Sequence, residues 1–259
     1  MKKHKFSLFV AAISLILPSF AAADSYLATG PTVTIAHAPF QGMRVDRVKN
    51  ILADGTTMTR DIKGRFARDS EGRVYEEEQQ VIDGGAAMPG APMRTTMIDL
   101  VKNYTLHWGT SPKIADVMGI SARENLHVTF PMQFTSPVIR EAPPAPGTEP
   151  DKVTTENLGQ KTIEGVVTTG TRTTTVIPTG KVGNDRPLKV VHDVWFSKDL
   201  ELALIETIED PRLGRDTLEI HDVSRVEPDA GLFRAPAGYQ VRNPLLGGVM
   251  GGVSPVPKQ

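Results

Sequence analysis

Tight turns separate short runs of strand-forming residues along most of this chain, a pattern typical of antiparallel β-sheet. The Asp54-Gly55 pair is a hairpin signal, because both residues tolerate the positive φ angles of a two-residue turn. A second turn covers residues 69–72 and ends in glycine. We therefore predict a three-stranded meander over residues 42–81.

Charged residues suggest the register of this meander. Closing the 69–72 turn symmetrically places Arg65 opposite Glu76, and closing the first turn places Asp46 opposite Lys63. Opposite charges directly across a strand pair contribute roughly 0.2–1 kcal/mol each. We predict one charged, solvated face, so that the three consecutive glutamates of the third strand belong to the sheet surface and not to a metal site.

Proline and glycine divide the rest of the chain. Five prolines and little apolar content between residues 136 and 152 indicate an extended loop or linker. A proline at position 112 suits the first residue of a short helical turn over 112–118. The expected order is an N-terminal β part over 24–135, a Pro-rich loop or linker over 136–160, a C-terminal β meander over 161–243 that completes the domain, and a disordered Gly-rich tail over 244–259.

These elements predict a mainly β fold: a curved antiparallel sheet or half-barrel of about ten strands with little helix. Hydrophobic residues make up 39% of the chain, enough to fill a core. The chain has no cysteine, which removes disulfides, thiolate metal sites, cysteine nucleophiles and a lipidated N-terminal cysteine. Stability must therefore rest on the sheet core.

Residues 1–23 have the order of features of a secretory signal peptide. A basic segment over 2–5 precedes an apolar run over 6–17, and small residues stand at Ala21 and Ala23. The apolar run is too short to span a bilayer. Removal of this segment, which holds three lysines and no acid, takes the formal net charge from −1 to −4. We expect a periplasmic or secreted protein with no integral membrane segment after cleavage.

The remaining charge and motif content narrows the function classes. Lys and Arg number 29 against 30 Asp and Glu, which argues against a nucleic-acid partner. The sequence contains no nucleophile elbow, phosphate-binding glycine loop or paired-histidine zinc motif. His192 and His221, with Asp193 and Asp222 beside them, could form a metal or general-base site only if both histidines faced one pocket. Strand alternation places each Asp on the opposite face from its neighbouring His, so we expect no cofactor, no metal and no catalytic residues.

Several short segments of the C-terminal half form a recognisable pattern. They are Asp193-Val-Trp195-Phe-Ser197, Leu200-Glu-Leu202, Asp210-Pro-Arg-Leu-Gly214, Val226-Glu-Pro-Asp229, Leu232-Phe233, Pro236 and Gly238-Tyr239. In these segments the chain resembles an uncharacterised family of secreted bacterial proteins. More distantly, the closing pattern is similar to the lipoprotein-carrier and sigma-regulator half-barrel superfamily, which includes LolA-, LolB- and RseB-like proteins.

That resemblance implies a curved antiparallel sheet whose concave face binds lipid or lipoprotein acyl groups. The candidate ligand-binding residues are Trp195, Phe196, Phe233 and Tyr239, and core packing is the competing explanation for these aromatic side chains. The expected role is a non-enzymatic envelope protein that binds an apolar ligand, a lipoprotein or another envelope protein. The alternatives are a structural or signalling module that pairs through an exposed sheet edge, and a periplasmic hydrolase.

Overall fold

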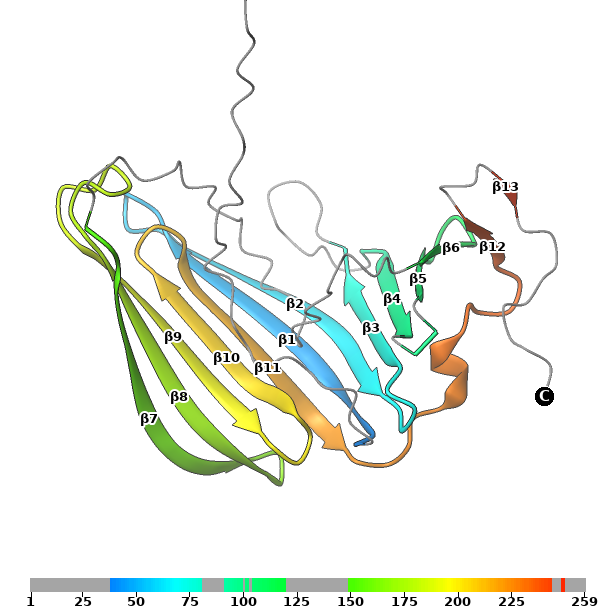
Figure 1. Cartoon of the computed structure of the whole chain (residues 1–259). Helices are drawn as coiled ribbons and strands as arrows, with labels where there is room; N and C mark the ends of the chain where they lie inside the picture. Colours follow the sequence, from blue (N-terminus) through cyan, green and yellow to red (C-terminus); the bar gives the residue numbers. More distant parts are fainter. Residues whose placement is uncertain are drawn as a thin grey trace, which may run out of the picture.

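The computed structural model describes residues 38–80, 91–99, 101–102, 104–119, 149–243 and 248–249, and the expected signal peptide lies outside them. These residues form one sheet (Figure 1). Its elements are β1 (Phe40–Ile51), β2 (Thr57–Arg68), β3 (Val74–Gln79), β4 (Met93–Asp99), β5 (Tyr104–Gly109), β6 (Ile114–Gly119), β7 (Lys152–Ile163), β8 (Val166–Ile177), β9 (Leu188–Ser197), β10 (Leu202–Asp210), β11 (Gly214–Ser224), the 3₁₀ turn η1 (Ala230–Phe233), β12 (Gln240–Asn243) and β13 (Gly248–Val249).

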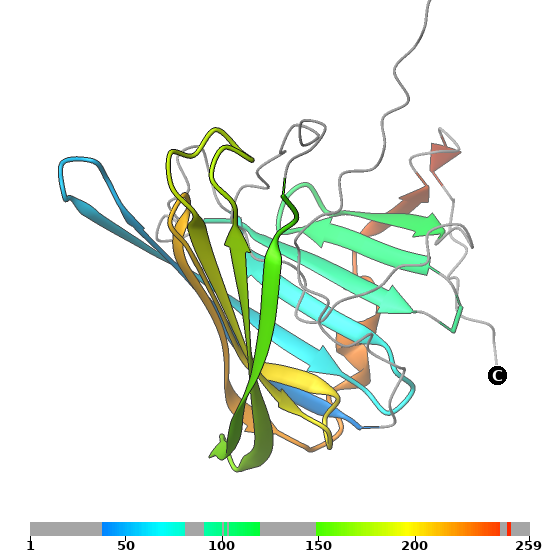
Figure 2. The ribbon, with the colours of Figure 1, turned by 60° about the vertical axis from the view of Figure 1, so that its left-hand side comes forward.

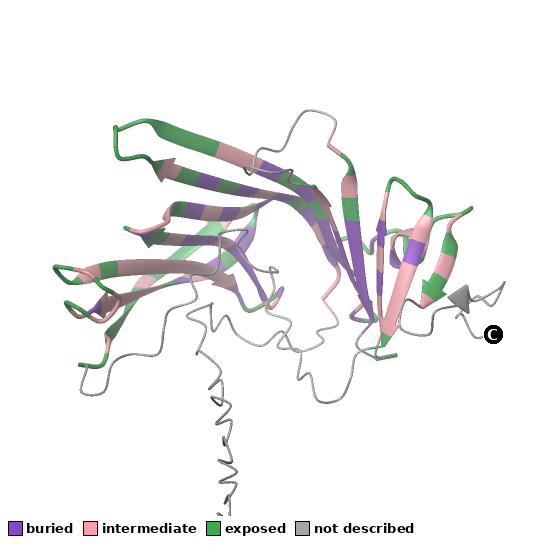
Figure 3. Ribbon diagram, turned by 90° about the horizontal axis from the view of Figure 1, so that it is seen from above, coloured by how far each residue is buried: buried purple, intermediate pink, exposed green. Residues whose placement is uncertain are grey.

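The predicted fold class is confirmed. The sheet is open and strongly curved, as the view from above shows (Figure 3), and η1 is its only helical element among the residues described. Strand order is β13-β12-β6-β5-β4-β3-β2-β1-β11-β10-β9-β8-β7, which gives thirteen strands instead of about ten. The two chain halves join through the antiparallel pair β1–β11, and β12 returns to pair in parallel with β6.

Two predicted segments have a different structure. Residues 152–160, which we predicted as part of the Pro-rich loop or linker, form most of β7. The prolines end at position 150, and Val153, Thr154 and Thr155 favour a strand. The predicted helical turn over 112–118 is wrong: Ile114–Gly119 is β6, which pairs with β5. Of the Gly-rich tail, the structure describes residues 248–249 as β13.

The register of the first hairpin is one residue away from the predicted one. Asp46 pairs with Ile62 instead of Lys63. The Leu52 N–H donates to the Thr56 carbonyl at 2.8 Å, and Gly55 has a φ of 85°. The loop therefore holds three residues, the last of them in the left-handed conformation, and not the two-residue turn that the sequence suggested.

The second hairpin is displaced in the same way. Arg65 pairs with Glu77, and the Asp69 N–H donates to the Arg73 carbonyl at 3.1 Å, so this loop holds residues 70–72 in place of the predicted 69–72. A one-residue change of pairing alters which side chains share a face. Asp46 and Glu76 consequently lie on the buried face, and the prediction of one solvated charged face is wrong.

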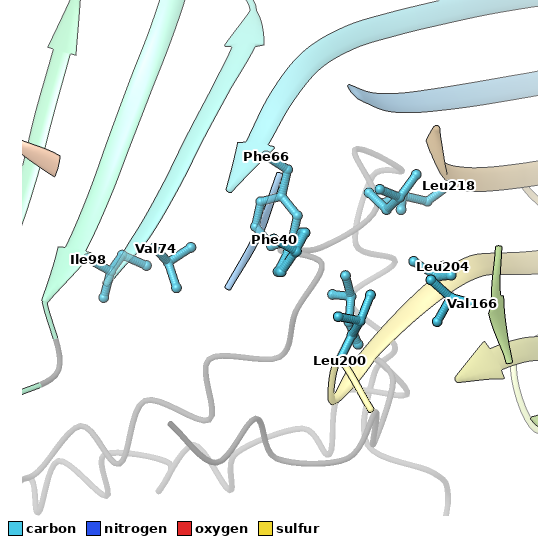
Figure 4. Packing of buried hydrophobic residues seen from close by; sticks show 10 residues of the cluster. Phe40, Phe66, Val74, Ile98, Val166, Leu200, Leu204 and Leu218 are labelled. Carbon is cyan, nitrogen blue, oxygen red and sulfur yellow. The ribbon is translucent and has the colours of Figure 1, made fainter. Parts of the chain in front are cut away.

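The main core lies on the concave side of the sheet. Its residues come from strands far apart in the sheet order, from Ile98 on β4 to Val166 on β8, and only curling of the sheet toward this side brings them together (Figure 4). The Arg68 guanidinium strengthens this closure, since it donates to the Leu200 carbonyl and lies 5.2 Å from the Phe40 ring centroid. The buried members are Phe40, Phe66, Val74, Ile98, Val166, Leu200, Leu202, Leu204, Leu218 and Ile220.

A second core lies on the opposite face of the β2–β6 half, whose strands Figure 2 shows beside one another. Tyr75, which alternates with the inward-facing Val74 and Glu76, packs there with Trp108 and other buried residues. The segment that contains η1 covers this cluster with Phe233, and the Tyr239 hydroxyl donates to the Gly109 carbonyl at 2.9 Å. The sheet therefore buries one face along its centre and the other face at its β6 end.

We expect Phe66→Ala to lower the free energy of unfolding by about 3–5 kcal/mol, because a fully buried ring would leave a cavity in the concave core. Met58→Ala is the control, since Met58 is 50% exposed on the same strand and should change stability by less than about 0.5 kcal/mol. Urea unfolding of both variants measures the difference. Equal losses would contradict the assignment of Phe66 to the core.

Candidate functional site

A free edge of the sheet is β7, the outermost strand at the left of Figure 1. Among the strands described, it pairs with β8 alone. Ten of its twelve side chains are exposed and the other two are half-buried. A strand at a sheet edge presents backbone donors and acceptors that can pair with another chain. We call Lys152–Ile163 the β7 edge.

Local sequence explains why this segment is a strand. β-Branched residues dominate β8 and form the Val153-Thr154-Thr155 run of β7, and threonine faces threonine where Thr154 pairs with Thr174 and Thr155 with Thr173. The start of β7 is fixed to the β8–β9 connection, because Lys181 Nζ lies 2.7 Å from a carboxylate oxygen of Asp151. The density of threonine in this region is accounted for by strand formation.

A β-bulge divides the β7 edge. The pairing with β8 shifts between Asn157 and Gly159. Gly159 has a φ of 84° and its N–H donates to Asn157 Oδ1 at 2.7 Å. A bulge bends a strand and disrupts regular pairing, and bulges are one way in which proteins limit edge-to-edge association. The regular part of the edge is therefore residues 152–157.

Two of the predicted ligand residues lie near this edge. Trp195 on β9 is half-buried, and Lys161 Nζ lies 3.7 Å above its ring centroid. Gly170, its partner on β8, leaves room for the ring, since a Cβ there would lie 2.7 Å from it. Phe196 follows Trp195 and therefore points to the other face, opposite Thr169.

The other two predicted ligand residues lie in the segment after β11, which packs over β3–β5. Phe233 is buried in the second core, and Tyr239 packs against that core with its hydroxyl bonded to Gly109. The structure therefore divides the four aromatic residues between β9 and the segment after β11, and does not bring them to one surface. Phe233 and Tyr239 both pack in or against the second core, and Tyr239 also lines a hollow between β3–β5 and the η1 segment.

A group of buried charges on β1 and β3 lies on the concave face, next to the main core. Arg44 shares this face with Ile220, its partner on β11, and its guanidinium contacts the Glu76 carboxylate. Asp46 and Glu78 lie 3.8 and 3.7 Å from the same guanidinium. The side chains of Arg44 and Asp46 are 4% and 1% exposed. We call these four residues the buried charge cluster; the predicted register concealed it.

Further polar groups extend this region along the concave face. Glu206 shares a face with Leu218 of the core and lies 2.7 Å from His192 Nε2. On β5, His107 contacts Thr96 Oγ1 at 3.1 Å. Burial lowers the pKa of His107, and the positive charge of Arg94 lowers it further, so the ring is neutral near pH 7. The middle of the concave face is polar.

His192 and His221 lie on opposite faces of the sheet and do not form one pocket. Ile208 of β10 pairs with both His192 and Asp216, so these two residues share the concave face. His221 pairs with Met43 on the other face. His221 Nε2 lies 3.2 Å from Glu219. Within the described ranges, no three histidine or acidic residues are placed to hold a metal ion.

Two hollows lie on the face opposite the concave core. The larger, of about 240 Å³, lies between β3–β5 and the η1 segment, and the smaller, of about 190 Å³, lies over β1–β4. They share Glu77 and Met93. Burial raises the pKa of Tyr75, in the larger hollow, to about 12, so its phenol stays protonated. Both volumes are below the roughly 300–1,000 Å³ of typical small-molecule sites.

No family model matches this sequence, and no curated protein matches it. Solved structures give distant matches. An uncharacterized conserved protein from Thermus thermophilus is 10% identical, with 81% of this chain and 92% of that chain covered and a TM-score of 0.39. A LolA superfamily protein from Nitrosomonas europaea is 9% identical, with 76% and 90% covered and a TM-score of 0.32.

MucB of Pseudomonas aeruginosa, in its complex with MucA, is 15% identical to this chain, with a TM-score of 0.37. The match covers 80% of this chain but 59% of MucB. A LolA superfamily protein and MucB are therefore among the solved structures to which this chain is distantly similar. In the part of the chain that the structure describes, no helix has the length and hydropathy needed to cross a membrane.

We expect Arg44→Met to lower the free energy of unfolding by about 3–5 kcal/mol, because it leaves the Asp46 and Glu76 carboxylates buried without this cation. Arg47→Met is the matched control: Arg47 is 49% exposed and bonds Asp61 at 2.9 Å on the outer face. Its loss should cost less than about 1 kcal/mol. Urea unfolding at neutral pH measures both, and adding Glu76→Met to Arg44→Met should restore part of the loss. Equal effects of the two arginines would contradict a buried charge cluster.

Proposed function

We propose that this chain is an exported, non-enzymatic protein of the cell envelope that binds a partner protein by strand addition at the β7 edge. The observation that carries this proposal is the exposure of ten of the twelve β7 side chains on a strand that, among those described, has one neighbour. Main-chain hydrogen bonds along such an edge supply affinity, and the alternating side chains supply specificity.

The concave face supports this proposal over binding of an apolar ligand. An acyl-chain carrier needs an apolar cavity of at least roughly 300 Å³. Here the core residues fill one end of the concave face, and the buried charge cluster occupies the region above it. A hydrocarbon chain in contact with these charges would exclude water from them and offer no hydrogen bond in return, which costs free energy.

Sequence features support the remaining parts of the proposal. The order of basic, apolar and small residues over 1–23 favours export. The lack of a hydrolase or phosphate-binding motif favours a role without catalysis, and the near balance of charge disfavours nucleic acid as the partner.

A photo-crosslinking amino acid in place of Thr155 should give a discrete protein adduct in intact cells, because this side chain is exposed on the regular part of the β7 edge. The same amino acid in place of Val167 is the control, since Val167 is 55% exposed but lies on β8. Val153→Lys should abolish the Thr155 adduct by placing a charge in the pairing strand. Electrophoresis of irradiated cells measures this, and equal adducts from both positions would contradict strand addition.

We expect protein purified from the periplasm to show only polypeptide masses, without an added lipid mass, in native mass spectrometry, and lipid extraction of the same sample to recover no stoichiometric lipid. The reason is that the described concave face is filled by its own side chains. A bound lipid at one equivalent would contradict the proposal and favour the carrier function. Absence of the protein from the periplasmic fraction would contradict export.

A further inference from the structure

We infer that a second copy of this chain pairs with the β7 edge, antiparallel and centred on Thr154, to give one sheet that runs through both molecules. This inference rests on the proposed function and specifies its partner. The argument uses the composition of the edge, the symmetry of such a pair and the position of the bulge.

Symmetry restricts the register. A two-fold axis perpendicular to the sheet keeps every side chain on its own face, so the centre must fall on a residue and not between two residues. With Thr154 at the centre, Lys152 lies opposite the partner's Glu156, and Glu156 lies opposite the partner's Lys152. Opposite charges directly across an antiparallel pair are favourable.

Neighbouring registers lack this match. A pair centred on Lys152 places lysine against lysine, and one centred on Glu156 places glutamate against glutamate, both unfavourable. In pairs centred on Val153 or Thr155, neither Lys152 nor Glu156 lies opposite a residue of the other charge. Within residues 152–157, the Thr154-centred register alone forms two lysine–glutamate pairs.

The uncharged residues fit the same register. Val153, which is 57% exposed, lies opposite the partner's Thr155, and Thr154 lies opposite its own copy. Pairs of β-branched residues are favourable across strands. Thr154, Lys152 and Glu156 then share one face, and Val153 and Thr155 share the other.

Glu156 is exposed and shares its one cross-strand cation with another carboxylate. Its partner on β8 is Arg172, whose guanidinium already donates two hydrogen bonds of 2.7 Å to Asp193 on β9. The bulge at Gly159 ends the regular strand just beyond Glu156, so the paired segment is short and the dimer reversible. The ion pair of Asp151 with Lys181 holds the start of that segment in place.

Charge reversal tests the register. In Lys152→Glu alone, glutamate opposes glutamate twice per dimer, and in Glu156→Lys alone, lysine opposes lysine twice. Each should weaken dimerisation about tenfold in sedimentation equilibrium. An equal mixture of the two variants should restore the wild-type association, because every glutamate then faces a lysine. Both residues are exposed, so folding is unaffected. Wild-type chain that stays monomeric, or a mixture no tighter than the single variants, would overturn the inference.

Cysteine cross-linking tests the centre directly, since the chain has no cysteine of its own. Directly opposed Cβ atoms lie about 4.5–5.5 Å apart, close enough for a disulfide with small adjustment. Under mild oxidation, Thr154→Cys should give a covalent dimer. Thr162→Cys, an exposed threonine on the same strand beyond the bulge, should stay monomeric. Equal dimer yields from both variants would overturn the inference.

The outcomes separate this inference from the function on which it rests. A monomeric chain whose Thr155 photo-adduct contains a different protein would leave strand addition standing and refute the second copy as partner. Loss of every adduct at Thr155, together with a monomeric chain, would refute both. A Thr155 adduct of twice the chain mass, reduced by Lys152→Glu, would support both.

Discussion

Curling of the sheet around its concave core is the constraint on which the rest of this structure depends. The sheet order separates β4 from β8 by six strands, yet Ile98 and Val166 belong to one buried cluster. Without disulfides, the apolar area removed from water at this cluster is the main force that holds the two chain halves together. The contact of Arg68 with the Leu200 carbonyl joins the same two halves by a hydrogen bond.

The same curvature accounts for the polar interior and for the free edge. Strands that curl toward one another bring Arg44, Asp46 and Glu76 out of water, where each charge depends on its partners. An open sheet, unlike a closed barrel, keeps its terminal strands unpaired. One result of this architecture is therefore a concave face occupied by the protein itself, and the other is a long edge on β7.

Strand content, the mainly β class and the curved open sheet could be predicted, because turn residues and alternation are local signals. The register could not be predicted. The first loop holds three residues in place of two, the second holds 70–72 in place of 69–72, and the first of these changes places Asp46 on the buried face. The parallel pairing of β12 with β6 also left no local signal. The β7 edge was not predicted, because the prolines before it led to the whole of 136–160 being placed in a loop or linker. The Val153-Thr154-Thr155 run within it is typical of a strand.

The parallel pair β6–β12 has a consequence for how the molecule is assembled. Asp116 and Arg242 form an ion pair across 126 positions of the chain, and the η1 segment covers the second core just before that strand. Contacts of such large sequence separation form late, since they must overcome the entropy of closing a long loop. A chain still emerging from synthesis keeps Tyr75 and Trp108 uncovered until the η1 segment and β12 arrive, so the second core closes only after residues 230–243 have been made.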